Sequence, residues 1–408
     1  RKFAANVYVA IREKKRLFAQ APTGIGKTMA ALYPAMLALG EGKCARVLML
    51  TARTTGRKSA MDALAVLQSR GAKLLAVEIA AKNKVCPMEK RDCRPEVCPY
   101  AKGFYDRLPD ALESALDGGN RERGEIGALA QAHRLCPFEL SLALAQLADV
   151  VVCDYNYVFD PFVAIDALMQ GGAALLIDEA HQLAPRVQDN ASAAVSAKQL
   201  RGLRRDAGQA LGRKHALYKA LTAALRALEE AARTEEFAAG RLEKPPEDLN
   251  AAMEGLLDAA GSALAEGAGP PASDAFSLAA CWQYAAGRLD ERYAVLTEGA
   301  EKTARIELFL LCAAQDILEK TKKARGAVFF SATLAPFEAA KRMLGSLDGD
   351  ACLALPSPFD KSQLDARILP VDLRYAARES SAPLVADAIE AQLAAHDGNA
   401  IVFFPSYA

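Results

Sequence analysis

Residues 21–28 combine small residues, a lysine and a hydroxyl in an order suited to holding phosphate. They read Ala-Pro-Thr-Gly-Ile-Gly-Lys-Thr, follow the apolar run 17–20 and lead into a helical pattern through Leu39. A strand that enters such a turn before a helix lets backbone N–H groups approach an anion. We expect Lys27 to reach the β- and γ-phosphates of ATP and Thr28 to bind Mg²⁺. The predicted ATP-binding residues are Gly24, Ile25, Gly26, Lys27, Thr28 and Met29.

A second apolar run ends in two acids and a histidine. Leu-Leu-Ile at 175–177 precedes Asp178, Glu179, Ala180 and His181. We expect Asp178 to bind Mg²⁺, directly or through water, and Glu179 to polarise the attacking water. His181 is expected to pass the state of the phosphates to the rest of the protein, and we include it in the ATP site. The alternative is that one of the acids only caps a helix.

Four of the nine cysteines gather in one stretch, as Cys86, Cys93, Cys98 and Cys136, and three of these precede a proline. Their spacing is C-x6-C-x4-C-x37-C. Structural zinc sites usually pair cysteines across two to four residues, whereas wider Cys₄ sets suit [4Fe–4S] clusters. Spacing alone leaves iron–sulfur, zinc and unrelated thiols open. The other cysteines stand singly in apolar surroundings and are expected to be buried; they are Cys44, Cys153, Cys281, Cys312 and Cys352.

Cations and aromatic residues surround this cysteine group. Positive charge follows a phosphate backbone and aromatic faces stack on bases, a combination typical of single-strand binding. We predict DNA contacts from Lys82, Arg94, Tyr100 and Tyr105, whereas Phe104 is expected to pack inside. A solvated charged face is the alternative. A second basic run, residues 198–219, has Asp206 as its one acid, and a solvated helix face is again the alternative.

Strand-like runs alternate with helical patterns along most of the chain, which predicts an α/β fold with a parallel sheet. The runs are 17–20, 47–51, 74–79, 149–153, 173–178, 327–331 and 400–404, and residues 2–18 read as a helix. Two stretches interrupt the alternation. Residues 81–137 are rich in Cys, Pro, Arg and Lys with no convincing strand. Residues 191–322 are alanine-rich and helical, with one helix expected to carry Ile306, Leu310, Ala313 and Ile317 on one face.

Composition excludes several classes of protein. The 408 residues carry 50 basic and 50 acidic side chains, so any polyanion site must be a local patch. No run approaches the ~18 apolar residues of a membrane span, and the N-terminus has no signal-peptide pattern. We expect a cytoplasmic protein. Because the first residue is Arg1, we also expect the chain to start inside a longer protein.

The motifs together resemble a known family. Asp178–His181 is a DEAH box, and with residues 21–28 it resembles a superfamily 2 helicase. Residues 51–54 (Thr-Ala-Arg-Thr) resemble the loop that touches DNA phosphates, and 330–334 (Phe-Ser-Ala-Thr-Leu) resemble the motif linking the ATP and DNA sites. Residues 154–161, 357–360 and 402–407 add further signatures. The set resembles the XPD/DinG (Rad3-related) iron–sulfur DNA helicases.

This resemblance implies roles for further residues. It adds Arg53, Thr54 and Tyr155 to the expected DNA contacts and gives Ser331 and Thr333 a coupling role. It favours a [4Fe–4S] cluster on the four cysteines, in addition to ATP and Mg²⁺. The implied function is ATP-dependent 5′–3′ movement on single-stranded DNA with unwinding of forked duplexes, in repair or replication and, in a bacterium, at the nucleoid. The alternatives are an ATP-switched DNA-binding module and a CRISPR- or nuclease-linked relative.

The resemblance also implies a domain order. The first motor domain, of RecA-like fold, would comprise residues 1–80, 138–190 and 323–345, interrupted by a cluster domain at 81–137 and a helical arch domain at 191–322. Residues 346–408 would begin a second RecA-like domain. In this family the second domain continues into arginine-bearing motifs that complete the ATP site. We therefore expect residues 1–408 alone to turn over little ATP.

Overall fold

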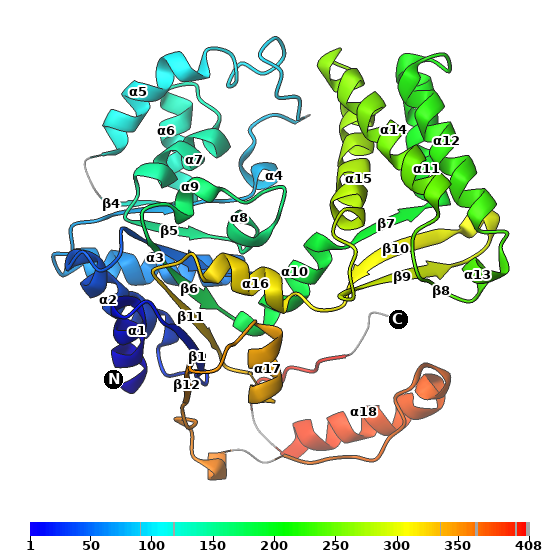
Figure 1. Ribbon diagram of the computed structural model, residues 1–408. Coiled ribbons are helices and arrows are strands. Elements are labelled where there is room, and N and C mark those ends of the chain that lie inside the picture. Colours follow the sequence, from blue (N-terminus) through cyan, green and yellow to red (C-terminus); the bar gives the residue numbers. More distant parts are fainter. Residues whose placement is uncertain (90, 117–118, 335, 364–365, 396–397, 405–408) are drawn as a thin grey trace. The chain divides into compact units, whose positions relative to one another are not determined.

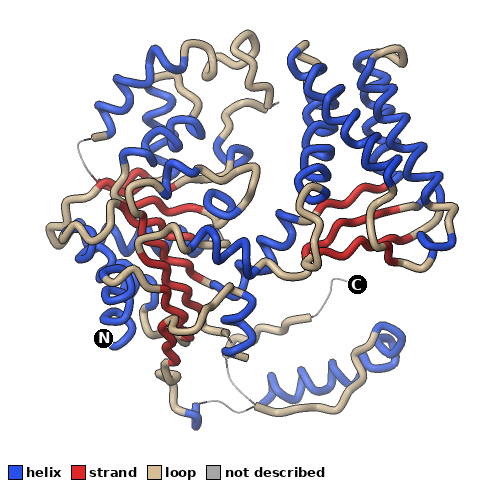
Figure 2. The backbone as a smooth tube through the Cα atoms, in the orientation of Figure 1, coloured by secondary structure: helices blue, strands red, loops and turns tan. Residues whose placement is uncertain are grey.

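The computed structural model describes residues 1–89, 91–116, 119–334, 336–363, 366–395 and 398–404. It divides into two compact units, Arg1–Pro358 and Phe359–Ala408. The larger unit contains both sheets of the described chain, shown in red in Figure 2. No described helix is long and apolar enough to cross a membrane.

An eight-stranded parallel sheet forms the centre of the larger unit, in the order β12-β1-β11-β6-β2-β5-β3-β4 (Figure 1). The predicted α/β fold with a parallel sheet is therefore confirmed. The strands are β1 (Arg16–Gln20), β2 (Arg46–Leu50), β3 (Leu75–Glu78), β4 (Gly119–Arg121), β5 (Val150–Cys153), β6 (Ala173–Asp178), β11 (Gly326–Ser331) and β12 (Ala351–Ala354).

Helices cover both faces of this sheet because its central strands are apolar on both sides. Alternate residues of β1 face opposite ways: Leu17 packs in the layer that includes Leu32 and Met61, and Phe18 packs in the layer that includes Leu140. The helices of this part are α1 (Lys2–Arg12), α2 (Lys27–Gly40), α3 (Thr54–Ser69), α4 (Lys82–Val85), α5 (Phe104–Ala115), α6 (Arg123–Ala132), α7 (Pro137–Leu147), α8 (Asn156–Phe159), α9 (Asp166–Met169), α10 (Leu183–Ala191), α16 (Ala314–Thr321) and α17 (Phe337–Met343).

Residues 191–322 contain a second sheet as well as helices. It is antiparallel, in the order β7-β10-β9-β8, with strands β7 (Ala193–Ser196), β8 (Arg241–Leu242), β9 (Tyr293–Glu298) and β10 (Arg305–Leu310). Long helices pack against one another beside it in Figure 1. They are α11 (Ala197–Leu211), α12 (Ala216–Ala231), α14 (Glu247–Ala265) and α15 (Pro270–Ala286), with the short α13 (Glu235–Ala238).

The structure corrects several sequence predictions in the larger unit. The expected helix 306–317 is wrong: Ile306 and Leu310 lie in β10, where alternate residues are buried, and a new helix begins at Ala314. The first helix ends at Arg12 rather than at residue 18, because Lys14 adopts a left-handed turn (φ 54°) before β1. The stretch 81–137 does contain a strand, β4, which pairs with β3 through backbone groups despite its polar sequence.

The remaining corrections concern the C-terminal part and the isolated cysteines. Because β12 pairs with β1, the larger unit extends to Pro358, beyond the expected boundary at 345. Residues 401–404 form no strand, since the described part of the smaller unit, mainly α18 (Arg378–Ala395), offers no strand partner. Residues 405–407 of that motif lie outside the described residues. Cys44 and Cys153 are buried as expected, whereas Cys281 is half-buried, and Cys312 and Cys352 are exposed.

Candidate nucleotide site and cysteine cavity

The loop after β1 has the backbone that phosphate binding requires. Gly24 and Gly26 both have positive φ, 84° and 72°, a region that residues with a Cβ rarely adopt. Gly26 is the N-cap of α2, so the helix begins at Lys27 with its first N–H groups directed at the loop. The Thr28 Oγ1 lies 3.4 Å from Ser59 Oγ. The loop therefore offers an anion both the helix N-terminus and a lysine.

The carboxyl end of β6 places two acids beside this loop. Asp178 is 8% exposed, and its Oδ1 accepts a 2.9 Å hydrogen bond from the Glu179 backbone N–H. Burial, helped by the charge of Glu179, raises the pKa of Asp178 to about 6, while the Lys27 ammonium opposes that rise. A divalent cation at this point would favour the ionised carboxylate. Glu179 has a φ of 49°, so the chain turns sharply directly after the strand.

Ser331, at the end of the neighbouring strand β11, joins this group. Its hydroxyl donates a 3.2 Å hydrogen bond to Glu179 Oε2 and lies 2.7 Å from His181 Nδ1. The Thr333 backbone N–H donates to the same hydroxyl at 3.2 Å. The register of the two strands pairs Phe330 with Asp178, which fixes this arrangement. The two sequence motifs that contain these residues therefore touch through one buried hydroxyl.

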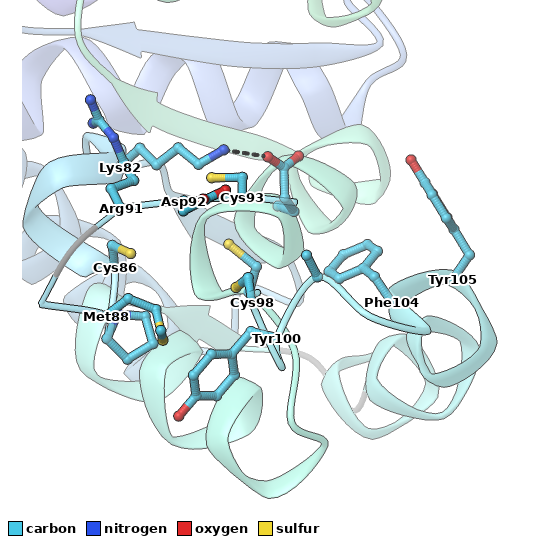
Figure 3. Close-up of a pocket in the computed structure, with 14 residues that line it drawn as sticks. Lys82, Cys86, Met88, Arg91, Asp92, Cys93, Cys98, Tyr100, Phe104 and Tyr105 are labelled. Carbon is cyan, nitrogen blue, oxygen red and sulfur yellow. Dashed lines mark hydrogen bonds and ion pairs between the residues drawn. The ribbon is translucent and has the colours of Figure 1, made fainter. Parts of the chain in front are cut away.

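The four clustered cysteines line one cavity of about 180 Å³ (Figure 3). Cys86 follows α4, Cys93 and Cys98 lie in the next loop, and Cys136 is the N-cap of α7. Burial raises the pKa of the Cys136 thiol, while backbone hydrogen bonds from Phe138 and Glu139 act in the opposite sense. Those N–H groups would stabilise a thiolate ligand. Among the described residues, no three His, Cys, Asp or Glu side chains converge as ligands of one metal ion.

Known families match the N-terminal half of the chain. A family described as DEAD/DEAH box helicase matches residues 1–92, and the family DEAD_2 matches residues 64–200. The XPD helicase subunit of transcription and DNA repair factor IIH from Arabidopsis thaliana is 25% identical over 213 residues, which cover 43% of this chain and 28% of that protein. Human regulator of telomere elongation helicase 1 is 28% identical over 102 residues, 24% of this chain and 8% of that protein.

Solved XPD structures share the fold. A structure titled XPD_Helicase matches this chain with a TM-score of 0.61 at 17% identity. The match covers the whole of this chain and 72% of the chain in that structure. One titled Truncated XPD covers 87% of this chain and 99% of its own, with a TM-score of 0.55 at 16% identity. Over residues 1–200 the chain is therefore similar to the DEAD/DEAH box and DEAD_2 helicase families, and part of it is similar in sequence to an XPD helicase subunit. It spans about a quarter of the XPD subunit that it matches.

The residues expected to contact DNA differ in their surroundings. Arg53 and Thr54 are exposed at the carboxyl edge of the sheet. Tyr105 is 83% exposed, whereas the neighbouring Phe104 is buried, as predicted. Tyr155 contradicts its prediction: it is fully buried, and its hydroxyl donates to the backbone oxygens of Asp178 and Glu179. We therefore assign it to positioning the acids, since a buried ring cannot reach DNA.

The two cations beside the cysteine cavity that were predicted to contact DNA, Lys82 and Arg94, already have partners within the protein. Lys82 Nζ lies 3.1 Å from Glu139 Oε1 and 5.2 Å from the centre of the Phe138 ring. Arg94 pairs with Asp92 and donates through Nη1 to the Gly267 backbone oxygen at 3.2 Å, across to residues 191–322. Tyr100 lines the cavity. Sequence reasoning missed Glu139, although its place three residues after Cys136 on a first helical turn was a usable signal.

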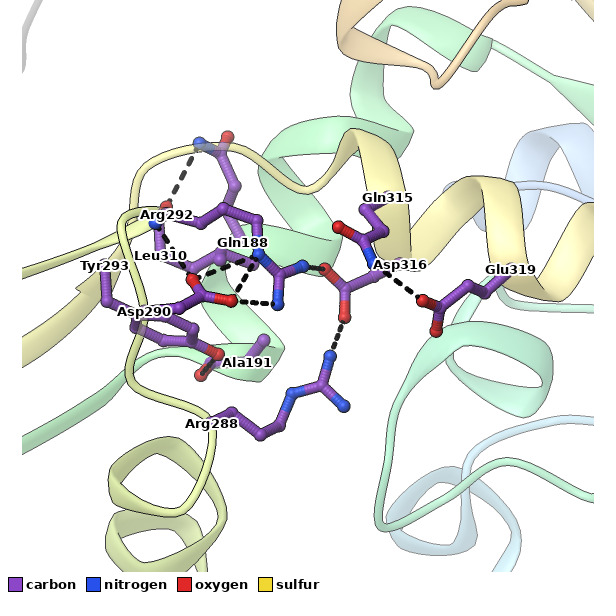
Figure 4. Close-up of polar contacts among 10 residues, drawn as sticks. All are labelled: Gln188, Ala191, Arg288, Asp290, Arg292, Tyr293, Leu310, Gln315, Asp316 and Glu319. Carbon is purple, nitrogen blue, oxygen red and sulfur yellow. Dashed lines mark hydrogen bonds and ion pairs between the residues drawn. The ribbon is translucent and has the colours of Figure 1, made fainter.

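An ion-pair network at the base of residues 191–322 was also missed (Figure 4). The carboxylate of Asp316, on α16, accepts hydrogen bonds from Arg288 and from Arg292 Nη1, the latter at 3.2 Å. Asp290 pairs with Arg292 at 2.8 Å. Both arginines lie between α15 and β9, so the network fastens the end of the helical insertion to α16. Nothing in the local sequence marks Asp316 as the partner of the two arginines, because the fold alone brings it to them.

Proposed function

We propose that this chain is the motor part of an ATP-dependent DNA helicase that moves 5′–3′ on single-stranded DNA and opens forked duplexes. The similarity to DEAD/DEAH box helicases and to an XPD helicase subunit supports the ATP-driven helicase class. The observation that carries the proposal is the Ser331 hydroxyl, which touches Glu179 and His181 at once. A change at the phosphates that moves Glu179 would move Ser331 and the segment behind it.

Each residue of the nucleotide site has a role that its position supports. Lys27, at the first turn of α2, would hold the β- and γ-phosphates against the glycine backbone. Glu179 would orient the attacking water and accept its proton. Thr28 and Asp178 would hold Mg²⁺, which when bound neutralises charge on the phosphates. Tyr155 keeps the acids in place by binding the backbone oxygens of the turn between them.

We propose that Cys86, Cys93, Cys98 and Cys136 hold a [4Fe–4S] cluster. In such a cluster each thiolate binds a different iron, so the sulfurs surround a volume rather than meet at one point. A shared cavity without a convergent single-ion group fits that requirement better than it fits zinc. The cluster would supply structural bonds to a segment that carries DNA-facing side chains. The candidate DNA contact that the structure leaves exposed there is Tyr105 on α5, whereas Arg94 already pairs with Asp92 and Gly267.

DNA-stimulated ATP hydrolysis and strand separation test this function. We expect single-stranded DNA to raise hydrolysis and a fork with a 5′ tail to be opened faster than one with a 3′ tail. Ser331→Ala removes the hydroxyl that bridges the motifs, so unwinding should fall about tenfold while hydrolysis falls much less. Ser380→Ala, on an exposed helix of the smaller unit, is the matched control. Hydrolysis unchanged by DNA, with no unwinding, would instead indicate an ATP-switched binding module.

A further inference from the structure

A second cavity, of about 700 Å³, opens at the amino-terminal edge of the parallel sheet. Its lining includes the residues just before three neighbouring strands: Ala45 before β2, Gly172 before β6 and Arg325 before β11. The strands run parallel, so this edge is opposite the one that carries the nucleotide loop, Asp178 and Ser331. The cavity is therefore separate from the ATP site and from the cysteine cavity.

The lining is strongly basic although the chain as a whole is neutral. It contains five cations and no acid: Lys14, Lys43, Lys322, Lys323 and Arg325. None of the five takes part in an ion pair between described residues. The acids nearest in sequence are engaged elsewhere, since Glu13 pairs with Arg12 and Lys15, and Glu41 accepts a hydrogen bond from Tyr8. Among the described residues, no acid therefore forms an ion pair with these five cations.

Arg325 makes this cavity more than a solvated basic patch. Its Nε is buried and has no hydrogen-bond partner among the described residues. Native proteins rarely leave a buried donor without a partner. The guanidinium also lies close enough to Cys44 to lower the pKa of that thiol, against the burial that raises it to about 11. A hydrogen-bond acceptor bound in the cavity could give Arg325 Nε the partner that it lacks among the described residues.

The remaining lining decides which anion fits. Gly42, Gly171 and Gly172 all have positive φ and bring bare backbone to the wall. No aromatic side chain lines the cavity, so a nucleobase would find no stacking surface. A volume of about 700 Å³ suits a small ligand rather than a nucleic-acid track. We propose that this cavity binds a compact multivalent phosphate, a linked di- or triphosphate group, whether free or carried by a nucleotide.

Titration with inorganic tripolyphosphate tests this site. The protein would carry Lys27→Ala, to weaken phosphate binding at the nucleotide loop, and Mg²⁺ would be left out. We expect one binding event, weakened at least tenfold by Lys322→Ala with Lys323→Ala, both exposed residues. Lys2→Ala with Lys73→Ala, which removes two exposed lysines elsewhere, should leave the affinity unchanged. Arg325→Gln should weaken binding further if the variant folds, as judged by circular dichroism.

Comparing the affinities of ATP and of free tripolyphosphate tests whether the cavity recognises the phosphate chain alone. ATP and tripolyphosphate should bind within about threefold of each other, because no side chain in the cavity recognises the base. A large preference for ATP would mean that the base is recognised, which this lining does not provide, and would contradict the proposal. Equal tripolyphosphate affinity in the Lys322/Lys323 variant and its control would overturn the proposal. So would a loss confined to duplex DNA binding, since that would make the basic residues a nucleic-acid contact.

Discussion

The nucleotide site and the cysteine segment (residues 81–137) position their functional groups in different ways. Asp178 and Ser331 are the last residues of two neighbouring strands that are fully buried. The apolar core therefore fixes their positions, and Ser331 lies within hydrogen-bond distance of Glu179. Cys93 and Cys98 lie in a loop, and Cys86 follows a helix of four residues. The comparison shows that the first site is held by packing. The second depends on polar contacts and, in our proposal, on bonds to a cluster.

The largest effect should come from the packed site. Glu179→Gln removes the carboxylate that accepts the proton of the attacking water, a contribution of about 10²–10⁴ in rate. The variant should still bind ATP, because Lys27, Thr28 and Asp178 are unchanged. Steady-state hydrolysis and equilibrium nucleotide binding measure the two properties separately. Unchanged secondary structure in this variant would show that the apolar core, and not the Glu179 side chain, holds the site together. Hydrolysis at the wild-type rate would refute the proposed role of Glu179 as proton acceptor.

The cysteine segment should respond by losing order as well as chemistry. Cys98→Ser removes a buried sulfur from the cavity, and we expect iron and acid-labile sulfide to be lost. Limited proteolysis within 81–137 should then rise at least tenfold, while nucleotide binding by the sheet persists. Cys312→Ser, at an exposed site outside the cavity, is the control and should keep its iron. About one zinc per wild-type chain without sulfide would reject the cluster.

The same contrast explains which features could be predicted from the sequence. The strand predicted over 173–178 matches β6 to the residue, because a buried parallel strand is a continuous apolar run with no competing pattern. The phosphate loop and the acids follow from such strands. By contrast, Ile306 and Leu310 fit a helical spacing and an alternating one equally well. Pairing with β9 on one side and with β7, more than 100 residues earlier in the chain, on the other decides between them.

Side-chain environment was the other feature that sequence could not supply. Tyr155 looked like a DNA contact, yet the fold buries it completely beneath the DEAH turn. Arg288 and Asp316 are 28 positions apart and meet only because β9 and β10 form a hairpin. Residue types and their local spacing therefore predicted which functional groups lie at the ends of the strands. They did not reveal which polar groups face inward.

The ion-pair network at the end of residues 191–322 tests whether polar contacts, rather than apolar packing, hold a segment in place outside the cysteine segment as well. Asp316→Asn should weaken the contacts of Arg288 and Arg292 by about 1–2 kcal/mol, a value reduced by their partial exposure. We expect faster hydrogen exchange at the end of α15 and in β9, with no change at β6. Asp258→Asn, an exposed acid on α14, is the matched control. Equal exchange in both variants would show that apolar packing alone fastens the insertion.

The smallest effect separates two neighbouring rings within the cysteine segment. Phe104 is 8% exposed and Tyr105 is 83% exposed, with ring centres 5.4 Å apart. Tyr105→Ala should weaken single-stranded DNA binding by about 1 kcal/mol, or fivefold, because an exposed ring can stack on a base. The fold and iron content should not change, and Tyr105→Phe should restore affinity since it keeps the ring. Phe104→Ala should instead increase proteolysis of the segment. If Tyr105→Ala also did so, the outer ring would serve packing rather than DNA.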